Sequence, residues 1–453
     1  MVGRLRTLMI ALAGASAMAA PAFATDLSIT CRCVEGGANS QMAEWIKQSV
    51  IPGFEKMKSE SGEDVTVTLK EFAGQDEQLT QQQALDFSTG AGADVNGFDG
   101  FLIPSFVEAG LLKPLDELAG PAVNEWEGWD HISDGSKQLM SFDGKVYGIA
   151  LGTDVRMIFI RKDLFEQAGI DADSWQPTSW DDLLDAARKI KEAVPDSSPL
   201  QINAGVSMGE ATTMQGYYML VLGADSGLKD ENGKWIVSSP GILDTLNFYK
   251  TVYLDEELGD RRAQLLGDGR NRTFANFRDG KTAMLVEGDW FYRAVTAPGS
   301  EFELKDRDNL MTWKKMPARE PGAGFSGQDF VTISGGTGFV LNPNTDAPEE
   351  AWDLLAYMNS KEQLEAFQTY QARIRLRDDV GIPDSPFLSE TSQELLPLTT
   401  ARPNDADYNK VSAEVQRMTE AVVSGEMSPE EAMEQYKAAV TEIVGAENTV
   451  SLQ

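Results

Sequence analysis

The sequence predicts an α/β fold built from two lobes. Strand-like and helix-like apolar patterns alternate along the chain, which is typical of proteins in which helices pack against a sheet. This alternation starts near the amino terminus and begins again in the middle of the chain. The chain has 453 residues, more than the ~100–200 of an ordinary domain, so we expect at least two folding units.

The first set of elements begins with a strand over residues 27–34 and a glycine-rich loop at 36–40. A helix follows, and Pro52 is expected to end or kink it because proline lacks a backbone N–H. Alternating Val and Thr predict a second strand over 65–69. Residues 97–103 read as a third strand or the end of one.

The second set is marked by clear helix starts. Ser179 and Asp182 form a capping-box pattern, in which each side chain satisfies a backbone N–H of the first turn. Ser428 and Glu431 repeat this pattern before the last helix. Between the two sets, a turn leads into a strand over residues 146–151.

The charge balance excludes several classes of protein. The chain has 39 Lys and Arg residues against 71 Asp and Glu residues, a formal net charge of −32. Such a surface repels nucleic acids and anionic membranes. His131 is the only histidine, so a multi-histidine zinc site cannot form. A Ser-His-Asp or Cys-His catalytic system would have to use this one residue. We therefore expect no multi-histidine metal site and no nucleic-acid partner.

The amino terminus resembles a secretory signal peptide over residues 1–24. Arg4 and Arg6 precede a short apolar run, and Ala22-Phe23-Ala24 supplies the small residues that a signal peptidase reads. The run is too short to span a bilayer, and no later stretch reaches ~20 apolar residues. We expect cleavage near Ala24 and export to the periplasm.

The two cysteines, Cys31 and Cys33, lie within the predicted first strand. An oxidising compartment permits a disulfide, but a bridge between residues two apart on a strand is geometrically strained. The sequence slightly favours two free thiols and leaves the disulfide open.

Five stretches, taken in order, are similar to motifs of one family. They are Asp94 to Asp99 with Glu108-Ala109-Gly110-Leu111-Leu112-Lys113-Pro114-Leu115-Asp116, Asp143-Gly144-Lys145-Val146-Tyr147-Gly148, Lys162-Asp163-Leu164-Phe165 with Ser179-Trp180-Asp181, Gly280-Lys281 to Trp290, and Gly335-Gly336 with Pro348 to Trp352. Together they resemble the extracellular solute-binding proteins of carbohydrate ABC importers (family 1), the group that includes maltodextrin-binding protein.

This resemblance implies a two-lobed periplasmic binding protein of type II, with the ligand in a cleft between the lobes. It places lobe 1 at 25–148 and 317–381, and lobe 2 at 149–316 and 382–453. It places the crossings near 148–152, 312–317 and 381–386.

The function implied is that of a periplasmic monomer which binds a mono- to oligosaccharide and delivers it to the membrane permease subunits of an ABC importer. Such a receptor has no chemistry of its own, so the resemblance implies no catalytic residue, no metal and no cofactor. The cleft is expected to close by hinge motion. The alternative is an exported glycoside hydrolase that uses a Glu/Asp pair.

Candidate ligand-binding residues are of the types that suit a sugar. Hydroxyls pair with carboxylates, amides and arginines, and the flat C–H faces stack on aromatic rings. Loops after predicted strands supply Glu35, Asn39, Ser40 and Gln75. A plain turn or surface loop remains the alternative at positions 35–40 and 75. The family resemblance adds Asp99, Arg156, Glu210, Thr212, Trp290, Gly336 and Thr337, and a run of alternating arginines adds Arg373.

Trp290 is the leading candidate, because the family's tryptophan at this motif often stacks on a sugar ring. Glu287 and Asp289 beside it are expected to accept hydroxyls. Arg156 could grip a hydroxyl or an acid, with a hinge ion pair as the alternative. Arg373 alternates with Arg375 and Arg377, so on a strand the three would share a face and could hold an acidic ligand, with a solvated face as the alternative. The family usually has small or apolar residues here. That departure leaves an anionic sugar open.

Overall fold

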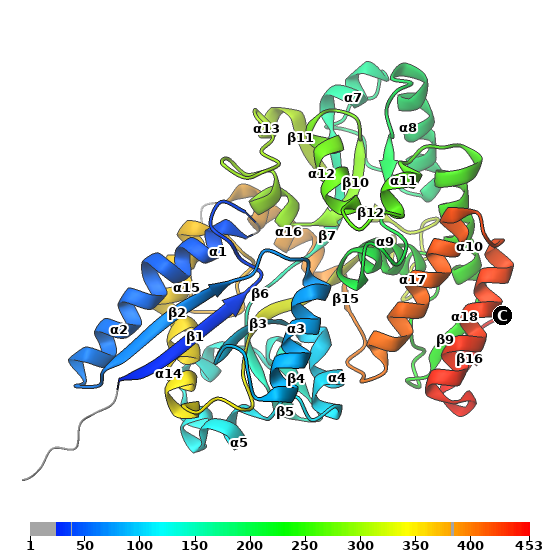
Figure 1. The fold of residues 1–453 in the computed structure, drawn as a ribbon. Helices are drawn as coiled ribbons and strands as arrows, with labels where there is room; N and C mark the ends of the chain where they lie inside the picture. The colour runs from blue at the N-terminus through cyan, green and yellow to red at the C-terminus, as the bar shows by residue number, and fades with distance from the viewer. Residues whose placement is uncertain (1–23, 38, 382–384) are drawn as a thin grey trace, which may run out of the picture.

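A computed structural model describes residues 24–37, 39–381 and 385–453, which form two α/β lobes (Figure 1). The first lobe contains a five-stranded sheet. In spatial order its strands are β2 (Val65–Glu71), β1 (Thr25–Cys31), β3 (Val95–Asp99), β14 (Gly336–Leu341) and β6 (Gly148–Thr153). A small hairpin of β4 (Ser141–Phe142) and β5 (Lys145–Val146) adjoins it.

The second lobe contains three smaller sheets. The largest has the order β11 (Met311–Lys314), β7 (Arg156–Arg161), β10 (Met284–Gly288) and β8 (Leu200–Gln201). The other two are β12 (Met316–Pro317), β13 (Phe330–Ser334) and β15 (Thr399–Ala401), and the pair β16 (Thr449–Ser451) and β9 (Trp235–Ser238).

Helices surround both sets of sheets. Those of the first lobe are α1 (Ser40–Trp45), α2 (Ile51–Glu60), α3 (Asp76–Thr89), α4 (Ile103–Glu108), α5 (Leu115–Ala119), α6 (Asp134–Lys137), α14 (Pro348–Met358) and α15 (Lys361–Tyr370). Those of the second lobe are α7 (Lys162–Gln167), α8 (Trp180–Ala193), α9 (Glu210–Leu222), α10 (Pro240–Lys250), α11 (Arg261–Gln264), α12 (Gly269–Arg278), α13 (Arg307–Leu310), α16 (Pro386–Leu395), α17 (Tyr408–Ser424) and α18 (Pro429–Val444).

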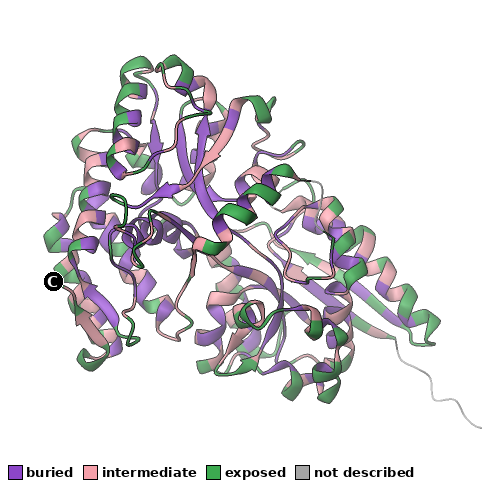
Figure 2. Ribbon diagram, turned by 180° about the vertical axis from the view of Figure 1, so that it is seen from behind, coloured by how far each residue is buried: buried purple, intermediate pink, exposed green. Residues whose placement is uncertain are grey.

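The first sheet is covered by helices on both faces. One apolar cluster joins β1 and β2 to α1, α2, α14 and α15, and a second joins β3 and β14 to α3 and α4. The largest cluster of the second lobe is centred on α8, α9, α10 and α17. Figure 2 shows that the central strands of both lobes are largely buried.

The local signals of the sequence are confirmed at several helix ends. Both predicted capping boxes form, at the starts of α8 and α18. Pro52 does not end its helix. A π-helical turn over Ile46–Val50 joins α1 to α2, and Pro52 lies in the first turn of α2, where its missing N–H is tolerated.

The chain changes lobes later than we expected at two points. We expected lobe 1 to end at 148, but β6 pairs with β14 in the first sheet as far as Thr153. We expected lobe 1 to resume at 317, but β13 packs Val331 and Ile333 into the cluster of the second lobe. The return to the first sheet therefore falls at Gly335. The third expected crossing includes residues 382–384, which lie outside the described residues.

Within the described part of the chain, no helix is both long enough and apolar enough to cross a bilayer. The predicted leader falls almost entirely on residues 1–23, outside the described residues.

Candidate binding site between the lobes

A cavity of about 730 Å³ lies between the two lobes. That volume is in the range of ~300–1,000 Å³ that is common for small-molecule sites. The first-lobe wall of this cavity carries Asn39, Gln75, Asp99, Thr337 and Arg373. The second-lobe wall carries Arg156, Glu210, Arg270, Trp290, Arg293 and Arg402.

The first-lobe wall is built from strand ends. β1, β2 and β3 run parallel, so their carboxyl ends meet at one edge of the sheet, where open α/β sheets bind ligands. Asp99 is the last residue of β3, and Gln75 follows β2 as the N-cap of α3. Thr337 of the antiparallel β14 lies directly opposite Asp99 in the sheet register.

Most of the residues proposed from sequence line this cavity. They are Asn39, Ser40, Gln75, Asp99, Arg156, Glu210, Trp290, Thr337 and Arg373. Three other candidates lie outside it. Glu35 is exposed and pairs with Lys47 at 2.9 Å, Thr212 is buried on α9, and Gly336 packs closely against Leu139.

Trp290 lies on the second-lobe wall, but its acidic neighbours do not face the ligand space. Glu287 and Asp289 are fully buried, so the expectation that they accept sugar hydroxyls is wrong. Each is held by an arginine, because a buried carboxylate needs a charged partner. Arg270 makes two bonds of 2.9 Å to Glu287, and Arg293 bonds Asp289 at 3.1 Å.

The indole of Trp290 is fixed by these same groups. Its N–H donates to Glu287 Oε2 at 3.0 Å. The guanidinium carbon of Arg156 lies 4.8 Å from the ring centroid, a cation–π contact. The ring is therefore oriented before any ligand arrives.

Arg156 forms the hinge ion pair that the sequence offered as the alternative to a role in ligand binding. It is 3% exposed, pairs with Asp154, and donates to Gln215 Oε1 at 2.5 Å. Burial lowers the pKa of Arg156, although Asp154 opposes this. Burial also disfavours the Asp154 carboxylate, but Arg156 and the Gly335 N–H hold its pKa below the usual value.

Asp99 is a half-buried acid on the first-lobe wall. Burial, together with the charges of Glu210, Asp154 and Asp76, raises the pKa of Asp99 to about 7, while Arg402 opposes the rise. Its carboxyl group makes no hydrogen bond to any of the described residues. It is therefore free to pair with a hydroxyl.

Sequence reasoning missed Arg402, which closes one side of the cavity. It donates to Glu210 Oε1 at 2.7 Å and stacks 5.0 Å from the ring of Phe101 on the first lobe. Nearby, Asn409 of the second lobe donates to Ser105 of the first at 2.6 Å. Nothing in the local sequence around Arg402 marks it, because its partner lies 192 positions away.

Arg32 was also missed, although strand alternation could have found it. Since it lies between two buried cysteines, its side chain must point to the opposite side, into the cavity. Its guanidinium donates to Gly74 O and Gln75 Oε1, both at 3.0 Å. Arg270 and Arg293 had no comparable signal, because only tertiary packing brings them to the cleft.

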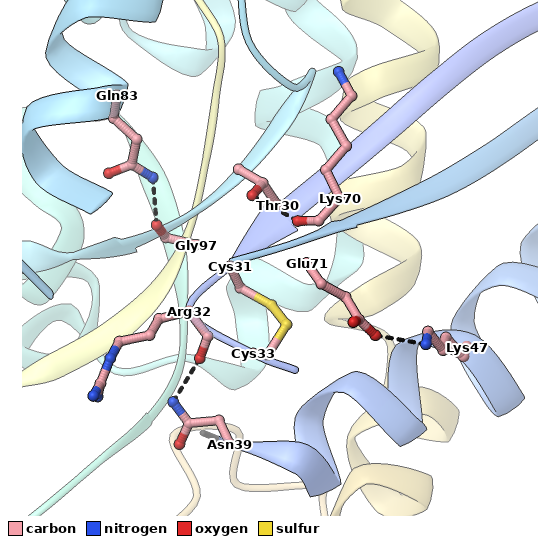
Figure 3. The surroundings of a disulfide bond; sticks show 10 residues. All are labelled: Thr30, Cys31, Arg32, Cys33, Asn39, Lys47, Lys70, Glu71, Gln83 and Gly97. Atoms are coloured by element: carbon pink, nitrogen blue, oxygen red, sulfur yellow. Dashed lines mark hydrogen bonds and ion pairs between the residues drawn. A yellow bond between two sulfur atoms is a disulfide. The ribbon is translucent and has the colours of Figure 1, made fainter. Parts of the chain in front are cut away.

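The two cysteines form a disulfide, so the sequence preference for free thiols is wrong (Figure 3). β1 ends at Cys31, and a turn in which the Cys33 N–H donates to Cys31 O brings the two Cα atoms to 5.2 Å. That separation is well within the range of disulfides, whereas residues two apart on a continuous strand lie at its upper limit, about 6.4–6.8 Å. Asn39 donates to the Arg32 carbonyl at 2.8 Å, which ties the turn to the site.

His131 lies away from the cavity. Its Nδ1 is 2.9 Å from Asp378 Oδ1, and Asp379 is close to its other nitrogen. Arg377 already makes two bonds to Asp379, so this cluster has a cationic partner of its own.

The comparisons with known proteins agree with this architecture. The chain matches the model of the bacterial extracellular solute-binding protein family over residues 39–365. A binding protein of Brucella abortus is 27% identical over 314 residues, 69% of each chain. The galactooligosaccharide-binding protein of Bacillus subtilis is 22% identical over 390 residues, which cover 86% of this chain and 84% of the relative.

Solved structures show the same fold. An ABC transporter solute-binding protein from Thermotoga lettingae, bound to α-D-tagatose, superposes with a TM-score of 0.75 at 23% identity, covering 93% of this chain and all of that one. The GacH receptor of Streptomyces glaucescens gives a TM-score of 0.73 at 20% identity, covering 94% and 99%. The fold is thus that of a two-lobed type II periplasmic binding protein, and the chain belongs to the bacterial extracellular solute-binding protein family.

Proposed function

We propose that this protein is the exported binding component of a sugar ABC importer. It takes up a mono- to oligosaccharide between its lobes and delivers it to the membrane permease without altering it. The observation that carries the proposal is the interlobe cavity, whose walls combine carboxylates, amides and guanidinium groups with the indole of Trp290. These are the groups that pair with sugar hydroxyls and stack on sugar rings.

The ligands named for relatives support the choice of a sugar. Relatives that align with more than half of this chain include arabinooligosaccharide- and galactooligosaccharide-binding proteins. The site residues we propose are those that line the cavity, and the lobes we propose change at 154 and 335. The amino-terminal pattern supports export, and family membership supports a permease as the partner.

Calorimetry with a panel of mono- and oligosaccharides tests the proposal. We expect at least one sugar to bind at a stoichiometry of one and to be recovered intact after long incubation. Small-angle scattering should show a smaller radius of gyration with that sugar, because the lobes close over it. Turnover of the bound sugar would show that the protein is a glycoside hydrolase and not a receptor. The absence of sugar binding would overturn both proposals.

A further inference from the structure

Six arginines line the interlobe cavity, and Arg373 differs from the other five. Arg32, Arg156, Arg270, Arg293 and Arg402 each lie within ion-pair distance of a carboxylate. Among the described residues, no carboxylate lies within 4.0 Å of the Arg373 guanidinium, although the residue is only 8% exposed. A buried charge without a partner is costly, so its retention calls for a reason.

The protein holds Arg373 in place with neutral groups only. Its Nη1 donates to Thr337 Oγ1 at 2.9 Å, and its Nε donates to Gln371 Oε1 at 3.1 Å. The backbone N–H of Arg373 donates to Gln368 Oε1 at 2.8 Å. A guanidinium has five N–H groups, so most of its donors have no partner among the described residues.

The surroundings of Arg373 contain more donors than acceptors. The side-chain amide nitrogen of Gln371 is buried and has no hydrogen-bond partner. The charged groups that act most on Arg373 are Arg293, Asp289 and Asp154, and both of these acids already pair with another arginine. Burial and the charge of Arg293 lower the pKa of Arg373 to about 9, because the two acids compensate only in part.

We propose that the sugar bound by this protein carries an anionic group, a carboxylate, sulfonate or phosphate, which pairs with the free edge of the Arg373 guanidinium. This inference rests on the proposed function and names the class of its substrate. The planar fork of arginine matches two oxygens of such a group, whereas a neutral hydroxyl uses one donor only. Asp99 lies on the same wall, opposite Thr337 in the sheet register, and then takes a hydroxyl of the sugar.

The neighbouring arginines provide a control. Arg375 donates to the carbonyl groups of Asp378 and Val380, and Arg377 pairs with Asp379 and Glu127. Neither lines the interlobe cavity. The segment is not a regular strand, so the alternating arginines do not share one face and only Arg373 reaches the ligand space.

The test uses matched pairs of sugars in calorimetry at low and high salt. The pairs are glucose with glucuronate, glucose with glucose 6-phosphate, and galactooligosaccharides with oligogalacturonates, with inorganic phosphate alone to detect recognition of the anion without the sugar. We expect one acidic sugar to bind at least tenfold more tightly than its neutral partner. Arg373→Gln should remove this preference, Arg373→Lys should restore part of it, and Arg375→Gln should leave it unchanged.

A ligand-free measurement separates this role from a structural one. If Arg373 is kept for a ligand, the unliganded Arg373→Gln protein should melt at the same temperature as wild type or higher, since an unpaired buried charge is gone. A clear fall in the melting temperature would assign Arg373 a structural role and overturn the proposal. Neutral sugars that bind as well as acidic ones would overturn the charge assignment alone, while binding of neither class would overturn the proposed function and this inference with it.

Discussion

The charged groups on the two walls of the cavity differ in whether they have ion-pair partners. On the second-lobe wall, Arg270, Arg293 and Arg402 are each bound to a buried carboxylate of the same lobe. On the first-lobe wall, Asp99 and Arg373 have no charged partner among the described residues. The second-lobe wall is therefore a self-neutralised, preorganised surface, and the first-lobe wall carries the groups that a ligand can satisfy.

This contrast predicts that substitutions on the two walls have opposite effects on stability. Breaking a pair on the second-lobe wall leaves a buried charge alone and destabilises the fold. Removing an unpaired charge from the first-lobe wall costs affinity instead and leaves the fold intact.

The largest effect is expected at Glu287 of the second lobe. Glu287→Gln removes the fully buried partner of Arg270, so the free energy of unfolding should fall by about 3–5 kcal/mol. Urea denaturation measures this loss. Glu256→Gln is the control, because Glu256 pairs with Arg188 in a solvated position, where a loss of ~1 kcal/mol or less is expected. Equal losses in both variants would contradict the preorganised second-lobe wall.

The next effect concerns Asp99 and depends on pH. Its pKa is raised to about 7 in the folded protein, so the folded state holds a proton that the unfolded state releases near pH 4. Asp99 therefore does not lower the free energy of unfolding below pH 4. As pH rises from about 4 to 7, Asp99 lowers this free energy progressively. Asp99→Asn should be more stable than wild type at pH 8, by on the order of 2 kcal/mol, and equal to it at pH 4.

Thermal or urea unfolding across this pH range checks the Asp99 prediction. Asp143→Asn is the matched control, because Asp143 lies in an exposed turn. A difference between Asp99→Asn and wild type that does not change between pH 4 and pH 8 would show that Asp99 is not held near neutrality.

The two walls also differ in how far the sequence predicted them. Gln75 could be found because it follows a strand, and the carboxyl ends of parallel strands meet at one edge. Asp99, the last residue of β3, was identified from the family resemblance. Trp290 and Glu210 came from the family resemblance. Arg270, Arg293 and Arg402 could not be found, since their positions depend on partners that only the folded chain brings together.

Local rules failed where tertiary contacts decided the outcome. Glu287 and Asp289 were expected to face the ligand, but both carboxylates are buried and pair with arginines. The α/β class, the two lobes and both capping boxes were predictable, because they follow from periodicity and short motifs. The lobe changes were displaced, because strand pairing extends β6 and β13 beyond the expected limits.

Trp290 tests whether the second-lobe wall contributes more than charge. Trp290→Ala should weaken sugar binding about tenfold or more, the scale of a lost stacking contact. Trp290→Phe should recover most of the affinity, because it keeps an aromatic face. It lacks only the N–H bond to Glu287. Calorimetry with the best sugar of the panel measures both variants. Unchanged affinity in Trp290→Ala would remove Trp290 from the site.

The smallest effect is expected at the disulfide beneath the first-lobe wall. Figure 3 shows Arg32 on the side of the strand opposite the Cys31–Cys33 bond, with Asn39 tied to the Arg32 carbonyl. Replacing both cysteines by serine frees this turn, so Arg32 and Asn39 must be ordered when the ligand binds. That ordering costs about 0.5–1 kcal/mol, which raises the dissociation constant two- to fivefold. Calorimetry of the double variant measures the change, with reduced wild-type protein as a second route to the same state. An unchanged dissociation constant in both would show that the turn keeps its shape without the bond, and that the first-lobe wall is as preorganised as the second.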